Sequence, residues 1–185
     1  MIVQTPNPVL TQKAKPIEKI DNKIIEIIDQ MKKTLTNTQN PKGVGLAAPQ
    51  IGISYRLFIT RPRDKNPIEV FINPEILWTS DEKDIIRRPK TSNKKIKDEK
   101  RLEGCLSINN IWGHVKRSTK VRLKFLDEKG RSQEKEFKDF EATIIQHECD
   151  HLEGILFTRR VLEQGNKLYK IEHEGEEEKL VEIEI

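Results

Sequence analysis

One short segment constrains this chain more than any other: residues 147–151, which read His-Glu-Cys-Asp-His. On a helix, side chains four residues apart project from one face, so His147 and His151 can reach a single metal ion. A solvated helix with two ordinary histidines is the competing interpretation. However, the segment is flanked by apolar residues such as Ile144 and Leu152, which predict a buried helix. Because buried ionisable groups need a metal or charged partners to offset their lost hydration, a metal site is favoured.

Two histidines do not complete a hydrolytic metal site, which usually has a third protein ligand and an open position for water. Cys105 is the best candidate, because it follows a glycine that lets the backbone come close to a ligand. Cys149 is two residues from each histidine, about 200° around the helix, so it cannot join them at one metal. We expect Cys149 to be a small buried apolar residue. Considered alone, Cys105 would be interpreted in the same way.

A third unusual run is Gly43–Gln50, with the sequence GVGLAAPQ. Its glycines and small apolar residues permit close approach by a peptide or a neighbouring strand. It is not a phosphate-binding loop, because it lacks the Lys-Ser/Thr ending of such loops. A tight turn packed on a sheet is the default interpretation, and Gln50 adds an amide donor that could stabilise an oxyanion.

Together, three runs resemble the signature motifs of the peptide deformylase family in the same order: Gly43–Gln50, Glu103–Ser107 and Gln146–Gly154. The resemblance implies a hydrolase that removes the formyl group from the N-terminal methionine of nascent polypeptides and releases formate. It also implies one divalent metal held by Cys105, His147 and His151. Fe²⁺ is the expected metal, although a Cys-His-His donor set also suits Ni²⁺, Co²⁺ and Zn²⁺.

The resemblance further implies roles for residues around the metal. Glu148 would take a proton from the attacking water and deliver it to the departing amine. Gln50 and the backbone N–H of Leu106 would hold the oxyanion. The residues implied for substrate binding are Gly43, Val44 and Gly45, by β-type pairing, and Ile144, with Ile145, in a pocket for the methionine side chain.

Two further acidic residues are open to more than one interpretation. Glu103 could pair with an arginine, for which Arg117 is a candidate, and Asp150 could anchor the helix. Both could equally be solvated surface groups.

The remaining pattern predicts one α+β domain over residues 1–185, with antiparallel strands packed around a central metal-binding helix at Asp139–Glu153. Asp139 is the predicted N-cap of this helix. An N-terminal surface helix is expected over Ile17–Thr38, with Asp21 as its N-cap. The predicted strands are Arg56–Thr60, Glu69–Ile72, Lys120–Phe125 and Ser132–Phe137, followed by a C-terminal hairpin of Lys167–Glu172 and Lys179–Ile185.

Charge patterning adds expectations about partners. Residues 81–101 are predicted to be a flexible basic insertion, and Arg87–Lys97 holds six basic residues and no acidic one. A mobile solvated loop is one interpretation of that stretch, and contact with ribosomal RNA is the other. Overall, 34 basic and 30 acidic residues nearly cancel, which argues against a DNA-binding role. The chain has no signal peptide and no apolar run of about 20 residues, so we expect a cytoplasmic protein without a membrane partner.

Two alternative functions are compatible with parts of the pattern. A zincin-type metallopeptidase shares His-Glu-x-x-His but takes its third ligand downstream of that motif. A non-catalytic peptide- or ribosome-binding relative could retain the fold without activity. Because Glu148, Gln50 and all three candidate ligands are present, the second alternative is disfavoured.

Overall fold

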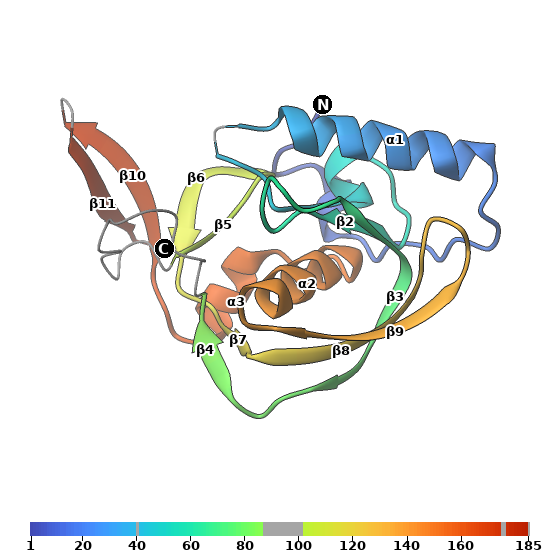
Figure 1. The fold of residues 1–185 in the computed structure, drawn as a ribbon. Coiled ribbons are helices and arrows are strands. Elements are labelled where there is room, and N and C mark those ends of the chain that lie inside the picture. Colours follow the sequence, from blue (N-terminus) through green and yellow to red (C-terminus); the bar gives the residue numbers. More distant parts are fainter. Residues whose placement is uncertain (40, 87–101, 175–176, 185) are drawn as a thin grey trace.

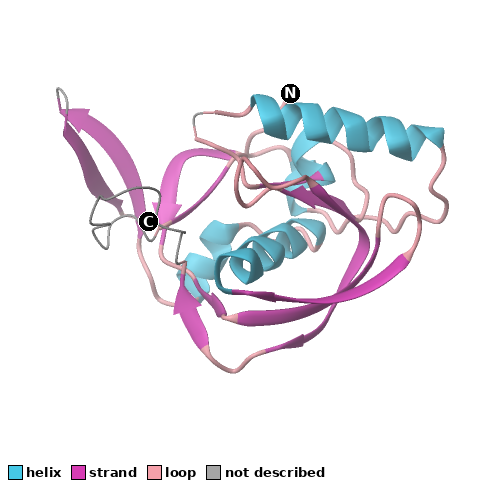
Figure 2. Ribbon diagram, in the orientation of Figure 1, coloured by secondary structure: helices cyan, strands magenta, loops and turns pink. Residues whose placement is uncertain are grey.

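The computed structural model of the chain describes residues 1–39, 41–86, 102–174 and 177–184, which form an α+β structure with antiparallel sheets (Figures 1 and 2). The predicted α+β class is therefore confirmed. The helices are α1 (Asn22–Asn37), α2 (Asp139–Leu152) and α3 (Phe157–Glu163), with 3-10 turns at Pro8–Thr11 and Ala48–Ile51. The strands are β1 (Gly45–Ala47), β2 (Leu57–Thr60), β3 (Glu69–Thr79), β4 (Lys83–Ile85), β5 (Glu103–Cys105), β6 (Ile108–Gly113), β7 (Lys116–Ser118), β8 (Lys120–Leu126), β9 (Ser132–Lys138), β10 (Leu168–Glu174) and β11 (Glu177–Ile183).

Helix α2 lies inside the curve of the largest sheet, whose strand order is β1-β2-β3-β8-β9 (Figure 1). Its apolar side chains are buried, including Ile145 and Leu152, because they pack against the aromatic side chains of that sheet. The helix ends at Leu152, one residue before its predicted end, and Gly154 just beyond it has a φ of 69°, which suits glycine. A Cβ at this position would lie 2.6 Å from the carbonyl oxygen of Thr11. The buried helix predicted from the flanking apolar residues is confirmed.

The predicted N-cap of α2 is wrong by one residue. Lys138 occupies the cap position, and Asp139 is the first helical residue, with a φ of 50°. The reason is that β9 runs into α2 with no intervening loop, so one residue must turn the chain sharply. Aspartate tolerates this left-handed conformation better than most residues.

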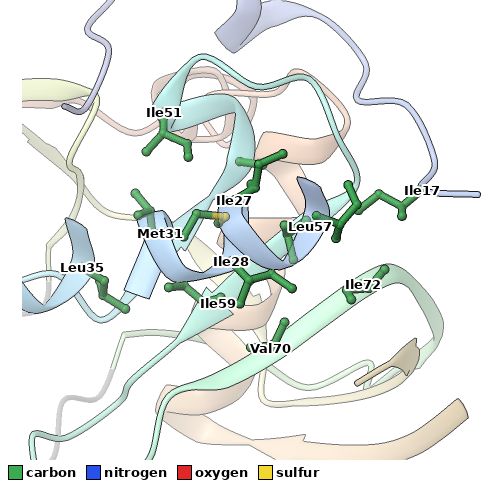
Figure 3. Close-up of a cluster of buried hydrophobic side chains, with 13 residues drawn as sticks. Ile17, Ile27, Ile28, Met31, Leu35, Ile51, Leu57, Ile59, Val70 and Ile72 are labelled. Carbon is green, nitrogen blue, oxygen red and sulfur yellow. The ribbon is translucent and has the colours of Figure 1, made fainter. Parts of the chain in front are cut away.

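Helix α1 begins later than expected, at Asn22, although its predicted cap is confirmed. The side chain of Asp21 accepts a hydrogen bond of 3.1 Å from the backbone N–H of Ile24. One face of the helix, which includes Ile28 and Met31, packs on β2 and β3 (Figure 3). Burying each such side chain contributes about 1.5–3 kcal/mol relative to exposure.

The four internal strands that we predicted are present, as is the C-terminal hairpin of β10 and β11, which extends from the body of the molecule (Figure 1). The strands that sequence reasoning missed include β1, β5 and β7, each of three residues, which is too short to reveal an alternating pattern. We expected residues 81–101 to be a flexible insertion. This prediction is wrong for residues 83–85, which form strand β4 and pair with β7. Residues 87–101, with the basic stretch Arg87–Lys97, lie outside the described residues.

Two strand edges meet near α2. Strand β1 is the outer strand of the largest sheet, and β5 is the outer strand of a second sheet with the order β11-β10-β6-β5. The glycine-rich run and Cys105 are therefore both presented at sheet edges. In the described part of the chain, no helix is long and apolar enough to cross a membrane.

Candidate functional site

The three candidate metal ligands lie together, although they come from β5 and α2. Cys105, His147 and His151 each offer one ligand atom, and these atoms lie within 4.8 Å of one another. Cys105 Sγ is 3.2 Å from His151 Nε2. Around a tetrahedral metal with bond lengths of about 2.0–2.3 Å, a thiolate sulfur and an imidazole nitrogen are separated by roughly 3.5 Å. Both the donor set and its spacing therefore fit a divalent metal.

A buried carboxylate orients His147. Glu103 Oε1 lies 2.6 Å from His147 Nδ1, which leaves Nε2 of the same ring for a metal. Arg117 donates two hydrogen bonds to Glu103, of 2.8 and 2.7 Å. Burial alone would raise the pKa of Glu103, but the charges of Arg117 and His147 hold it well below its usual value. Glu103 is therefore a fixed negative charge behind the metal site.

The same arginine ties α2 to this network. Arg117 donates to Asp150 over 2.9 Å, and Arg160 donates to the other oxygen of Asp150 over 2.7 Å. The expected pairing of Glu103 with Arg117 is confirmed, and so is the anchoring role of Asp150. The alternative that these acidic residues are solvated is wrong, because both are less than 9% exposed.

The pKa values of the two histidines shift in opposite directions. Burial alone would lower the pKa of His147, but the charges and hydrogen bonds of Glu103 and Cys105 raise it by more. The net shift of this pKa is therefore upward. The pKa of His151 is lowered, first by burial and then by the charge of His147. His151 is thus held neutral, which is the protonation state that a metal ligand needs.

Two donors converge on the Cys105 sulfur. Gln50 Nε2 and the backbone N–H of Ser107 each lie 3.4 Å from Cys105 Sγ. The orientation of Gln50 is fixed because its Oε1 accepts a 2.8 Å hydrogen bond from the backbone N–H of Ala47. The short 3-10 turn after β1 thereby aims the Gln50 amide at the candidate metal centre.

Glu148 lies beside this centre with a free oxygen. It is 3% exposed, and Glu148 Oε2 is buried without a hydrogen-bond partner among the described residues. Burial raises the pKa of Glu148 to about 7, which suits a group that exchanges protons near neutral pH. Gly45 packs directly on it: a Cβ at Gly45 would overlap Glu148 Oε1 and lie 2.8 Å from its Cδ. Glycine is thus required at this position by the close approach of the carboxylate.

Cys149 is separate from the site. It packs against the core cluster of the largest sheet, and burial raises the pKa of its thiol. The helical geometry that excluded it as a ligand is therefore consistent with its position.

A cavity of about 920 Å³ opens over the centre. Its lining includes Gln50, Cys105, Leu106, His147 and Glu148, so the structure brings the predicted catalytic residues together. The predicted substrate-binding residues also line it: Gly43, Val44, Gly45 and Ile144. His151 lies behind them, 1% exposed.

One wall of this cavity is apolar. Ile86, Phe140 and Ile144 form a buried cluster against which Val44 packs. Ile145, which we expected in the same pocket, instead faces the opposite core cluster. This prediction is wrong because consecutive helical residues point about 100° apart.

Several residues of the cavity were missed from the sequence. Phe140 and Thr143 precede His147 by seven and four residues, so helical spacing could have identified them. By contrast, Ile86 and Trp112 come from distant segments, and no local pattern marks them.

The register of β1 shows which backbone groups face the cavity. The N–H of Arg61 donates to the carbonyl of Val44 over 2.7 Å, and Gly45 is paired opposite Thr60. In an antiparallel ladder, hydrogen-bonded and non-hydrogen-bonded pairs alternate. Because the backbone carbonyl of Val44 points toward β2, the backbone N–H and C=O of the next residue, Gly45, point the other way, to the open edge of the sheet.

Comparisons with known proteins agree on one family. The model of the family described as polypeptide deformylase matches residues 1–167. The peptide deformylase of Pseudothermotoga lettingae is 39% identical over 151 residues, covering 82% of this chain and 76% of that protein. The peptide deformylase of Bartonella tribocorum is 37% identical over 162 residues, covering 84% and 80% of the two proteins. The crystal structure of the Thermotoga maritima peptide deformylase superposes with a TM-score of 0.73 at 34% identity, covering 86% of this chain and 95% of that one.

Proposed function

The chain belongs to the peptide deformylase family, enzymes that remove the formyl group from N-terminal methionine, and we propose that Cys105, His147 and His151 hold its metal ion. The observation that carries this assignment is the position of Glu148, which lines the same cavity as Cys105 and His147 and has one buried oxygen without a partner among the described residues. The family is metal-dependent, and we propose Fe²⁺ as the native ion, although the donor set also suits Ni²⁺, Co²⁺ and Zn²⁺. When bound, the metal lowers the pKa of a water and polarises the formyl carbonyl.

The side chains then supply the proton transfers and the charge stabilisation. Glu148 accepts a proton from the attacking water and passes it to the methionine nitrogen as the C–N bond breaks and formate leaves. Gln50 Nε2 and the backbone N–H of Leu106 donate hydrogen bonds to the oxyanion that forms on the former formyl oxygen. Because Gln50 is held by Ala47, it is oriented before the substrate arrives.

The same cavity accounts for recognition of formyl-methionine. We place the methionine side chain against the apolar wall of Val44, Ile86, Phe140 and Ile144. The backbone of the peptide pairs with the open edge of β1 through the N–H and C=O of Gly45. Gly43 continues the same edge, and Val44 contributes mainly its side chain because its carbonyl already accepts from Arg61.

A zincin-type metallopeptidase fits this arrangement less well. The third member of the ligand cluster, Cys105, comes from β5, which precedes α2 in the chain, whereas a zincin takes its third ligand after the helix. Formate release from a formyl-Met peptide and cleavage of an internal peptide bond distinguish the two functions in one assay. We expect formate without internal cleavage, and internal cleavage without formate would reject the assignment.

We also propose that residues 1–185 form one catalytic domain that works in the cytoplasm, where nascent chains emerge. The basic stretch Arg87–Lys97 is proposed to contact ribosomal RNA during this encounter, on the strength of its six basic residues. Replacing basic residues in this stretch by glutamine should weaken co-sedimentation with ribosomes, and more strongly at low salt. Unchanged co-sedimentation would reject the contact. The residues to replace are Arg87, Arg88, Lys94, Lys95 and Lys97.

A further inference from the structure

Basic side chains also line the cavity that holds Cys105 and His147. Lys42, Arg61, Arg63 and Lys65 all line the cavity, and we call these four residues the basic rim. They come from two loops, one before β1 and one after β2. Their position at a substrate cavity raises the question of what charge they attract.

The basic rim is not neutralised within the described part of the chain. Asp64 pairs with Lys42, and the hydrogen bond from Lys42 lowers the pKa of Asp64, so this carboxylate is ionised. Within the described residues, the Arg61 guanidinium donates to the backbone carbonyl of Asp64 over 2.6 Å, and its Nε is buried without a hydrogen-bond partner. Four cations and one carboxylate leave a net charge of +3 here. Of the cavity's other carboxylates, Glu103 is paired with Arg117 and His147, and Glu148 packs against Gly45.

The path of a bound peptide leads from the metal to the basic rim. Gly45 contacts Glu148, so the formyl end must lie beside Gly45. From Gly45 the protein chain leads back through Val44 and Gly43 to Lys42. The hydrogen bond from the Arg61 N–H to the Val44 carbonyl places the loop after β2 next to this segment. A strand rises about 3.4 Å per residue, so a peptide paired with β1 reaches the basic rim roughly 10 Å from its formylated residue.

We infer that the basic rim selects formyl-Met peptides that carry acidic residues in the second to fourth positions after the methionine. The inference rests on the deformylase function proposed above and adds a sequence preference to it. Asp and Glu side chains at these positions meet uncompensated guanidinium and ammonium groups, whereas Lys and Arg are repelled. Because Arg63 and Lys65 are exposed, the preference acts through screened electrostatic attraction and falls with ionic strength.

Three amidated peptides test the preference: formyl-Met-Ala-Asp-Asp, formyl-Met-Ala-Asn-Asn and formyl-Met-Ala-Lys-Lys. For the wild-type enzyme at low salt, we expect kcat/KM for formate release to fall in that order. The first and last peptides should differ about tenfold or more, and the difference should shrink toward unity in 0.5 M salt, where the Debye length is only about 4 Å. Equal kcat/KM for all three would overturn the inference, whereas absence of formate from every peptide would refute the deformylase function itself.

A pair of charge-reversed variants locates the effect. In the double variant Arg63→Glu with Lys65→Glu, the order of kcat/KM for the Asp and Lys peptides should invert, with the Asn peptide remaining between them. The matched control, Lys19→Glu with Lys129→Glu, makes the same charge change at exposed positions outside the cavity and should keep the wild-type order. If both variants shift the order equally, overall charge rather than the basic rim is responsible, and the inference is wrong.

Discussion

The contact between Gly45 and Glu148 makes a sharp prediction about a single methyl group. In Gly45→Ala the new Cβ would lie 2.8 Å from Glu148 Cδ, whereas non-bonded carbon atoms prefer about 3.5–4.0 Å. The carboxylate must therefore move by about 1 Å. A misplacement of this size costs about 10²-fold in rate, equivalent to roughly 2.7 kcal/mol of barrier.

The assay is steady-state formate release from formyl-Met-Ala-Asn-Asn amide, with kcat and KM determined separately. We expect the loss in kcat, because the displaced group transfers protons and does not bind the substrate. The free energy of unfolding should fall by about 1–3 kcal/mol, the usual cost of overpacking a buried site, so the variant should still fold. In the control Gly43→Ala, the new Cβ meets the flexible ends of Leu35 and Leu106, which can move aside, so the loss should be under tenfold. A kcat of Gly45→Ala within threefold of wild type would refute the proposed position of the base.

Two further predictions concern the metal ligands and the network behind them. Cys105→Ser should lose most of its bound metal by elemental analysis, whereas Cys149→Ala should keep it because Cys149 packs against a core cluster away from the ligand atoms; full metal in the first variant would exclude Cys105 as a ligand. Arg117→Met leaves two buried carboxylates short of a partner and should reduce the free energy of unfolding in urea by about 3–5 kcal/mol. Its control, Arg122→Met, removes only half-exposed ion pairs of 4.0 Å and should cost about 1 kcal/mol or less; similar losses in the two variants would contradict the importance of the buried network.

The candidate site could be predicted in part from the sequence because the helical portion of it is local in the chain. His147, Glu148 and His151 lie within two turns of one helix, whose buried position follows from apolar neighbours such as Ile144 and Leu152. The same spacing predicts that Cys149 is not a ligand. Geometry of this kind is fixed by the 3.6-residue repeat and needs no tertiary information.

The parts of the fold and of the cavity that the sequence did not predict depend on contacts between distant segments. The three-residue strands β1 and β5 are held by neighbouring strands, so their own sequences carry no alternating signal. Ile86 joins the apolar wall from a part of the chain that we expected to be a flexible loop. Asp139 shows the same limit at a helix end, because its positive φ results from the direct junction of β9 and α2.

The most direct test of the whole account compares wild-type enzyme with Glu148→Gln, measuring formate release and bound metal in the same preparations. We expect wild type to release formate stoichiometrically from a formyl-Met peptide. The amide variant should bind an equal amount of metal but lose about 10²–10⁴-fold in kcat, since it cannot accept the proton of the attacking water. A Glu148→Gln enzyme that turns over within tenfold of wild type would contradict the proposed role of Glu148.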